Sequence, residues 1–395
     1  MSEKKEKTKK KTHGGGKKQK ITPTMAAALK IALIFFVAIS IIFIGARTIG
    51  GVTLTSLAGD IKVFFQSLGW GDGYPCKTTG EPAQMIFSEN GKAFVFSKDK
   101  TLLLSSSAKK IAEIPVEYGN PAIKFKNGKA IIYDRDSSKL RIQSTSDIIS
   151  EKEADGIILA ASIGKKGNFA AATQGKGSAI KLKVYNKKQK EAFSWEFTGE
   201  KVTDIDLSDD GKYAVVSTIA SKNAQVNSKV YVFKFDSKKY VSCFDFENCA
   251  VVNVNYDSAH NIEIISNIGR GYIKDNSTLG ETEKFGSDIL FKCSSTNKNY
   301  SAVALKKYGG DNFGTVKIFK GGKLKSTADI NKEIKDVFCT DNYTLVLTVS
   351  SVMVFKNSSG TLKKEIDADL SASEIAVSDR KIYMMSPSEI LREKF

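Results

Sequence analysis

A turn followed by an apolar strand recurs through much of this sequence, at a spacing that few folds can accommodate. The clearest copies are "ENGKAFVFS" at 89–97, "KNGKAIIYD" at 126–134, "KKGNFAAAT" at 165–173 and "SDDGKYAVVS" at 208–217. Weaker copies start at Ala259, Asn297, Thr340 and Ser378. Aligned on the turn, successive copies lie 37 to 49 residues apart, with a mean near 41. This period of about 40 to 45 residues matches a four-stranded propeller blade better than a helical repeat of about 34 residues or a leucine-rich repeat of about 20 to 29.

Residues 202–246 show what one repeat contains. "VTDIDLS" predicts an inner strand, and "DDG" predicts a turn in which glycine takes positive φ without steric cost. "KYAVVSTIA" is almost entirely apolar, as expected for a strand whose sheet is covered on both faces. A polar hairpin, "SKNAQVNS", separates it from "KVYVFKFD", and "KKYVSCFDF" predicts the outer strand. The repeat therefore predicts four antiparallel strands.

The same interpretation divides the rest of the chain into 82–116, 120–152, 156–199, 249–284, 287–328, 333–367 and 370–392. The last unit has room for only three strands. A propeller must close, because an open edge strand promotes aggregation. We therefore expect "GDGYPCKTTG" at 71–80 to supply the missing outer strand. The prediction is an all-β, eight-bladed propeller of four-stranded antiparallel blades over residues 71–395, or a seven-bladed one if the stretched unit 249–284 is irregular.

The chain before the repeats predicts a membrane anchor. Residues 1–24 form a Lys-rich tail, and residues 25–47 are apolar apart from the flanking Lys30 and Arg47. With Lys30 reaching the headgroups, this segment is long enough to span a bilayer as one helix. The positive tail favours a cytoplasmic N-terminus and an extracytoplasmic propeller. The alternative is a cleaved signal peptide, with "IGA" at 44–46 as its processing site.

Residues 48–70 predict an amphipathic linker helix, because apolar residues recur at helical spacing up to Gly69, and Trp70 follows. This helix can lie on the outer face of the membrane, where an interfacial aromatic is favourable, or it can pack under the propeller.

The formal net charge of +17 does not by itself predict nucleic-acid binding. The short tail supplies +7 of it, and about +8 is spread thinly over the residues after Arg47. We expect a solvated lysine-rich surface there, no nucleic-acid partner, and a tail held near anionic lipid.

Five cysteines follow the predicted span. Cys243 and Cys249 lie six residues apart, and Cys293 and Cys339 occupy matching places in successive repeats. Both pairs are candidate disulfides, with Cys76 left over, although spacing alone does not fix connectivity. Buried free thiols are the alternative.

Catalytic and cofactor motifs are missing from the sequence. The acidic pairs Asp134 with Asp136, Asp204 with Asp206, and Asp209 with Asp210 fall at strand ends or turns, where aspartate commonly bonds the backbone. No CxxC, GxSxG or phosphate-loop motif occurs, and His260 sits in a repeat turn. We therefore predict no catalytic residue, no metal site and no cofactor.

The layout of a Lys-rich tail, one span, a linker and "GDGYP" at 71–75 opening a repeat-built propeller resembles an uncharacterised family of bacterial single-pass, membrane-anchored β-propeller proteins. More general relatives are the WD40-like and quinoprotein-like propellers. The resemblance implies a fold and a topology, and it carries over no catalytic residues. The recurrent Trp motif of the quinone-cofactor enzymes is missing, since only Trp70 and Trp195 occur.

We expect a non-catalytic protein-binding or scaffolding module at the outer face of the cytoplasmic membrane. Its contacts would come from rim loops such as Ser221–Ser228 and Gly309–Phe313. The first alternative is an extracytoplasmic enzyme or binder of a glycan or small molecule in the central channel, which would require acidic side chains converging at the channel mouth. The second alternative is a sensor that signals through its tail.

Overall fold

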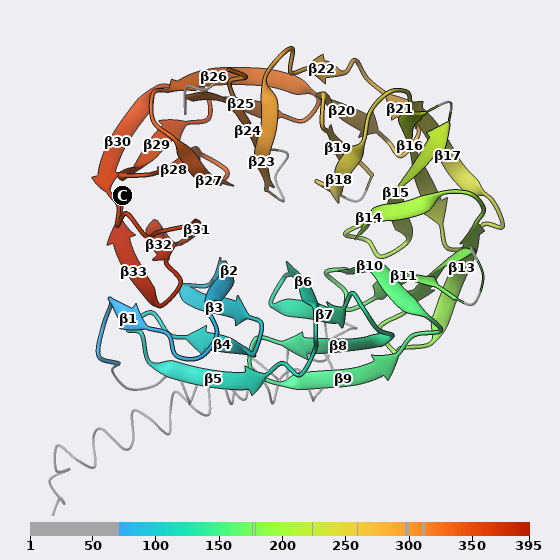
Figure 1. The fold of residues 1–395 in the computed structure, drawn as a ribbon, viewed down its shortest axis with the longest axis horizontal. Coiled ribbons are helices and arrows are strands. Elements are labelled where there is room, and N and C mark those ends of the chain that lie inside the picture. The colour runs from blue at the N-terminus through green and yellow to red at the C-terminus, as the bar shows by residue number, and fades with distance from the viewer. Residues whose placement is uncertain are drawn as a thin grey trace, which may run out of the picture. The chain divides into compact units, whose positions relative to one another are not determined.

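Eight antiparallel sheets surround a central axis in the computed structural model (Figure 1). The structure describes residues 71–395 except 176, 178, 223, 259, 297–299 and 310–312. The predicted tail, span and linker helix, with Lys30, Arg47 and Trp70, lie outside the described residues. Within the described part, no helix is both long enough and apolar enough to cross a membrane.

In each blade, the inner strand lies nearest the central axis, and the second strand pairs with it on its outer side. The inner strands are β2 (Ala83–Glu89), β6 (Pro121–Lys126), β10 (Ile157–Ile163), β14 (Lys201–Leu207), β18 (Val251–Tyr256), β23 (Ile289–Ser295), β27 (Ile334–Cys339) and β31 (Glu374–Ser378). The second strands are β3 (Lys92–Ser97), β7 (Lys129–Asp134), β11 (Phe169–Gln174), β15 (Tyr213–Lys222), β19 (Ile262–Ser266), β24 (Tyr300–Lys306), β28 (Tyr343–Thr348) and β32 (Lys381–Met385).

Two further strands complete each blade toward the perimeter. The third strands are β4 (Lys100–Leu104), β8 (Lys139–Ser144), β12 (Ile180–Tyr185), β16 (Gln225–Lys234), β20 (Gly269–Lys274), β25 (Gly314–Lys320), β29 (Ser351–Lys356) and β33 (Glu389–Lys394). The outer strands are β5 (Lys110–Pro115), β9 (Ile148–Glu153), β13 (Glu191–Phe197), β17 (Tyr240–Phe246), β21 (Thr278–Leu279) with β22 (Glu283–Lys284), β26 (Lys323–Ile330), β30 (Leu362–Asp367) and β1 (Cys76–Lys77).

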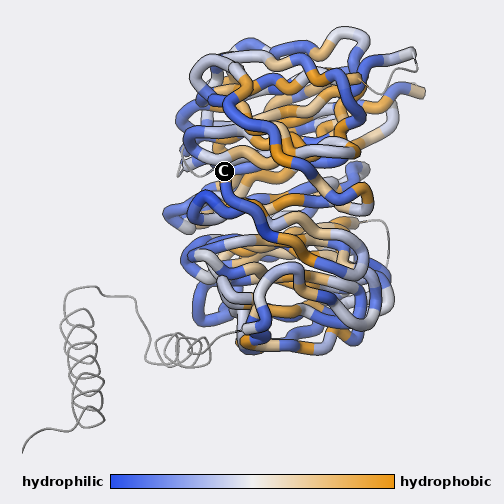
Figure 2. The backbone as a smooth tube through the Cα atoms, turned by 90° about the vertical axis from the view of Figure 1, so that its left-hand side faces the viewer, coloured by the Kyte–Doolittle hydropathy of each residue, from blue (hydrophilic) through white to orange (hydrophobic). Residues whose placement is uncertain are grey.

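The second strands form the core, because neighbouring blades cover them on both faces. In β7, Ala130, Ile131 and Ile132 are all fully buried, although their side chains alternate between the two faces. The predicted all-apolar strands are thereby confirmed. Figure 2 shows hydrophobic segments crossing the interior of the disc between hydrophilic loops at its two ends.

The repeated turn takes the conformation that the sequence predicts. Asn90 and Gly91 have φ of 51° and 69°, and Asn127 and Gly128 have 52° and 69°. Two consecutive residues with positive φ suit a tight hairpin between twisted strands. Gly167 and Gly211 also have positive φ.

The ring closes as predicted. β1 pairs with β33 through Cys76 opposite Ile390 and Lys77 opposite Glu389, which completes the last blade with residues from the start of the described chain. The Tyr383 hydroxyl also donates to the Gly91 carbonyl at 2.8 Å, joining the last blade to the first.

The stretched unit 249–284 is a complete blade, so the count is eight and not seven. Its outer strand is broken into β21 and β22, and both of these short strands pair with β20. The segment Ser221–Ser228, expected as a rim loop, instead continues the paired strands β15 and β16, with Ser221 opposite Val226. Polar side chains can extend a hairpin beyond the blade, because they stay solvated while the backbone ladder continues.

Candidate functional site

Ion pairs join inner strands near the central axis across three blades. Lys124 on β6 in blade 2 lies 2.5 Å from Asp204 on β14 in blade 4, and Lys126 lies 2.9 Å from Asp206 on the same strand. Blade 3 stands between blades 2 and 4, so these pairs pass on the channel side of β10. From β10, the Ser162 hydroxyl donates to Asp206 at 3.2 Å.

The same two aspartates also hold the next blade. The backbone N–H groups of Val254 and Tyr256 on β18 donate to Asp204 and Asp206 at 3.0 and 2.9 Å. Burial alone would lower the pKa of Lys124, but the charges of Asp204 and Asp206 outweigh it and raise this pKa. The cluster is therefore a structural tie that runs from blade 2 to blade 5.

A second cluster lies on the other side of the ring. Lys292 on β23 contacts Asp336 on β27 at 2.9 Å and Glu374 on β31 at 3.0 Å. Asp336 accepts the N–H of Ile375 at 2.9 Å, and Glu374 accepts the N–H of Ile86 at 3.3 Å. Burial raises the pKa values of Asp336 and Glu374, against the opposing charge of Lys292.

The acidic pairs noted in the sequence serve the fold in the structure. Asp134 accepts backbone N–H groups from Asn120 and Asp136, and Asp209 pairs with Lys165 at 2.6 Å. The described residues contain no group of three or more His, Cys, Asp or Glu side chains that could hold a metal ion. His260 lies in a turn, where Nδ1 is 3.1 Å from the Asn276 amide nitrogen.

Strand direction gives the disc two different ends. One end of the disc carries the connectors between blades and the loops between second and third strands. We call this end the connector face, and the inner strands start there. They finish at the turn face, which carries the repeated turns and the loops between third and fourth strands. Because β1 is an outer strand, residues 71–75 enter the disc at the turn face.

Each of the eight connectors carries a carboxylate. These are Glu81, Glu117, Asp155, Glu200, Glu247, Asp288, Glu333 and Asp369. Lys332 is the single Lys or Arg in the same connectors. Some of these carboxylates are paired, as in Asp155 with Lys183 at 2.5 Å. The connectors themselves are therefore acidic on a protein that is basic overall.

Exposed apolar side chains also gather on the connector face. They sit at inner-strand starts, in second-to-third hairpins and in one connector: Met85, Ile157, Val226, Val252, Ile268, Ile289, Tyr308, Phe313 and Leu370. Tyr308 is 80% exposed and Leu370 is 75% exposed. The predicted rim loop Gly309–Phe313 belongs to this face, and its residues 310–312 lie outside the described part.

The turn face is rich in lysine, most densely on blades 3 and 4. We call six exposed lysines there the lysine patch: Lys187, Lys188, Lys190, Lys212, Lys238 and Lys239. None of them forms an ion pair with another described residue, whereas the nearby Lys165 is paired with Asp209.

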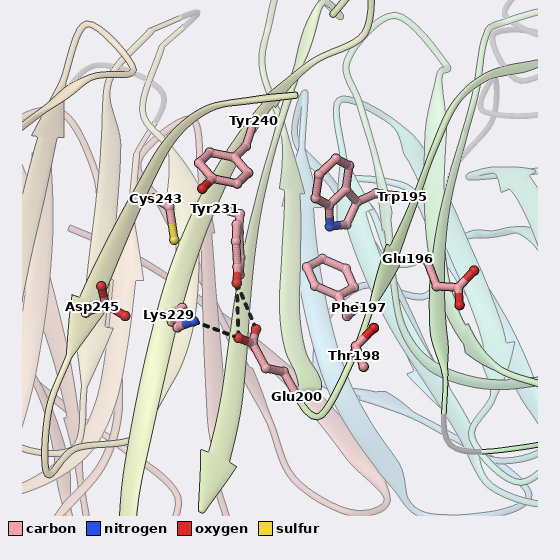
Figure 3. A pocket seen from close by; sticks show the side chains of 10 residues that line it. All are labelled: Trp195, Glu196, Phe197, Thr198, Glu200, Lys229, Tyr231, Tyr240, Cys243 and Asp245. Atoms are coloured by element: carbon pink, nitrogen blue, oxygen red, sulfur yellow. Dashed lines mark hydrogen bonds and ion pairs between the residues drawn. The ribbon is translucent and has the colours of Figure 1, made fainter. Parts of the chain in front are cut away.

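A pocket of about 400 Å³ opens on the perimeter between blades 3 and 4 (Figure 3). Trp195 of β13 and Tyr240 of β17 lie at one end, with ring centroids 6.0 Å apart, and Glu200 lies at the other. Glu200 accepts the Tyr231 hydroxyl at 3.0 and 3.1 Å and the Thr218 hydroxyl at 2.7 Å, and it pairs with Lys229 at 3.1 Å. This carboxylate is therefore saturated, and the pocket suits binding better than acid–base chemistry.

Burial and the nearby Glu200 charge raise the pKa of Tyr231 well above its ordinary value, so its hydroxyl remains a donor. Burial and then Asp245 raise the pKa of the Cys243 thiol to about 11. Sequence reasoning missed this pocket, although Trp195 and Tyr240, aromatic residues on neighbouring outer strands, were the available signal.

All five cysteines are free thiols in the structure, with Cys249 and Cys339 buried and the other three partly exposed. Cys293 and Cys339 do occupy neighbouring inner strands, where the Cys339 N–H donates to Ser294 at 3.0 Å. Burial raises the pKa of each of these two thiols to about 12. Cys243 lies on β17, Cys249 lies in the following connector, and Cys76 lies on β1.

Residues 73–390 match the family described as "Family of unknown function (DUF5711)". No curated protein matches the sequence.

Several solved structures share the fold. Sqt1 from Saccharomyces cerevisiae superposes with a TM-score of 0.59 at 10% identity, covering 81% of this chain and 98% of that one. The C-terminal WD40 domain of Sif2 gives 0.59 at 11% identity, covering 82% and 99%. BamB from Moraxella catarrhalis gives 0.53 at 11% identity, covering 81% and 100%. At such identities the likeness concerns the fold alone.

Proposed function

The chain belongs to the DUF5711 family of unknown function, and we propose that it is a membrane-anchored, extracytoplasmic β-propeller that binds a protein without catalysing a reaction. The fold resembles WD40 propellers and BamB, and it is consistent with a protein-binding module. In this proposal the partner docks on the connector face, and the propeller acts as a scaffold at the cell envelope.

The observation that carries the proposal is the set of exposed apolar side chains on the connector face. Soluble surfaces rarely expose many large apolar side chains on one side without a binding role. Here the inner-strand starts, including Ile157, Val252 and Ile289, lie around the channel opening, and Tyr308 and Leu370 project from loops. A partner that covered them would remove apolar area from water, which is the main favourable term in association.

The charges of the same face indicate what the partner carries. Each of the eight connectors adds a carboxylate to this face, and Glu81, Glu117 and Glu247 are exposed. Complementary charge guides encounter and fixes register. We infer a partner with an apolar contact surface flanked by Lys and Arg.

Anchoring rests on the sequence. Segment 25–47 is apolar and follows a tail with nine lysines, which favours one span with the propeller outside.

The experiment is affinity purification of the full-length protein after crosslinking in intact cells, followed by mass spectrometry. The control is a chain that ends at residue 70 and so keeps the tail and the predicted span. A partner recovered at near-stoichiometric yield only with the full-length chain supports the proposal. Equal recovery with the control would contradict it.

A second candidate function, a glycan or small-molecule site in the channel, has one observation in its favour. Asp336 and Glu374 converge on Lys292, and both carboxyls have raised pKa values, a combination enriched at functional sites. Each carboxylate also accepts a backbone N–H of the next blade, which a purely structural tie explains. Binding of a glycan or metabolite from a screened panel that is lost in Glu374→Gln, with the melting temperature kept, would favour this candidate.

A further inference from the structure

We propose that the turn face of blades 2 to 4 docks on an anionic lipid bilayer through the lysine patch and the apolar side chains beside it. This surface is separate from the connector face and does not require a protein partner. Three features of the described residues support the proposal.

The first feature is the charge of the turn face. The six lysines of the patch come from three loops on two adjacent blades, and none is neutralised by an ion pair with another described residue. Three aspartates share the loops of these blades: Asp209 pairs with Lys165, Asp210 accepts the Ser208 hydroxyl, and Asp236 pairs with Lys234. Solvated ammonium groups on flexible stems suit the diffuse charge of a lipid surface, and each adds about fivefold to binding near anionic headgroups.

The second feature is apolar. Ile148 and Ile149 begin the outer strand of blade 2, and Tyr240 and Val241 begin that of blade 4, all four between 45% and 49% exposed. Since outer strands start at the turn face, these side chains lie at the same end as the lysines. Apolar and aromatic side chains next to lysines are the composition that binds the boundary between headgroups and acyl chains.

The third feature is the path of the chain. Residues 71–75 enter the disc at the turn face, where the Gly73 N–H donates to the Ser107 carbonyl at 3.1 Å. The described chain therefore begins at the same end of the disc as the lysine patch. The six lysines offer no Arg fork of the kind that binds phosphates with two parallel hydrogen bonds, which favours a bilayer over a nucleic acid.

The test is amine acetylation of the full-length protein reconstituted in vesicles, with the rate at each lysine followed by mass spectrometry. Vesicles of phosphatidylcholine are compared with vesicles containing about 30% phosphatidylglycerol, at low salt and at about 0.5 M salt, where exposed charges are screened. The internal references are Lys98, Lys201 and Lys307, exposed lysines at the connector face.

We expect acetylation of the lysine patch to slow at least about threefold in the anionic vesicles and to recover in high salt, with the references unchanged. The variant carrying Lys187→Glu, Lys188→Glu, Lys238→Glu and Lys239→Glu should lose the protection of Lys190 and Lys212. The matched variant with Lys98→Glu, Lys201→Glu and Lys307→Glu should keep it.

Equal rates in the two kinds of vesicle would overturn the proposal. Protection of the patch by short single-stranded DNA but not by anionic vesicles would also overturn it, and would assign the face to nucleic acid.

Discussion

The ammonium of Lys124 in blade 2 lies 2.5 Å from the carboxylate of Asp204 in blade 4, so one ion pair spans a whole blade along the channel wall. Asp204 then accepts the Val254 N–H of blade 5. The pair therefore holds together parts of the ring that backbone hydrogen bonds do not join.

Replacing Lys124 by Met should destabilise the propeller by about 3 kcal/mol, because the mostly buried Asp204 carboxyl loses its ion-pair partner. The midpoint of urea unfolding measures the effect. Lys110→Met, which removes an exposed partner of Glu113, is the control and should cost less than about 1 kcal/mol. Equal losses in the two variants would show that the channel pair is no stronger than a surface pair.

Ring closure can be tested at Tyr383. Its hydroxyl donates to the Gly91 carbonyl across the junction of the last and first blades, and Tyr383→Phe leaves that carbonyl without its donor. We expect a loss of about 1–2 kcal/mol in the free energy of unfolding. Tyr308→Phe, at an exposed site, should leave stability unchanged. An unaltered Tyr383→Phe protein would mean that β1 closes the ring without help from this bond.

Alkaline pH should weaken the Lys183 ion pairs. Hydrogen bonds from Lys183 to Asp155 and Glu191 raise the pKa of this lysine to about 12, above its ordinary value of 10.5. A raised pKa in the folded state means that the stabilisation is complete below about pH 10.5 and is lost as the pH rises toward 12. The melting temperature of the native protein should therefore approach that of Lys183→Met across this window. A constant difference between the two would contradict the assigned pKa.

The Cys243 thiol should react slowly with alkylating reagents at neutral pH, because burial and the Asp245 charge raise its pKa to about 11 and the thiolate is the nucleophile. Asp245→Asn removes the second cause and should increase the alkylation rate of Cys243 several-fold, measured by mass spectrometry. The alkylation rate of Cys76, which lies on β1 in the last blade, serves as the reference. An unchanged Cys243 rate in Asp245→Asn would leave burial as the whole cause.

The blade count was predictable because its signal is local. Each blade has one turn between its first and second strands, so counting these turns counts blades, and Asn90–Gly91 and Asn127–Gly128 adopt the two consecutive positive φ values that such tight turns favour. The closing strand was predictable by the same logic, since a three-stranded last unit leaves an edge that residues 71–80 can cover.

The ion pairs between inner strands of different blades could not be predicted in the same way. Lys124 and Asp204 lie 80 residues apart on inner strands two blades apart, and nothing local in either repeat marks the other. Their contact depends on the diameter of the closed ring, which the sequence does not encode in any one segment. The composition of the connector face and the turn face could have been predicted, because the strand order alone assigns each loop to one end of the disc. The carboxylate in every connector becomes visible once that assignment is made.

Site-specific photocrosslinking in intact cells tests whether a protein binds the connector face. A photoreactive amino acid replaces Ile289 on the connector face or, as the matched control, Leu362 at the turn face; these side chains are 51% and 47% exposed. The account predicts a discrete crosslinked protein adduct from position 289 and none from position 362. An adduct from position 362 alone, or none from either position while the propeller is folded and abundant, would contradict it.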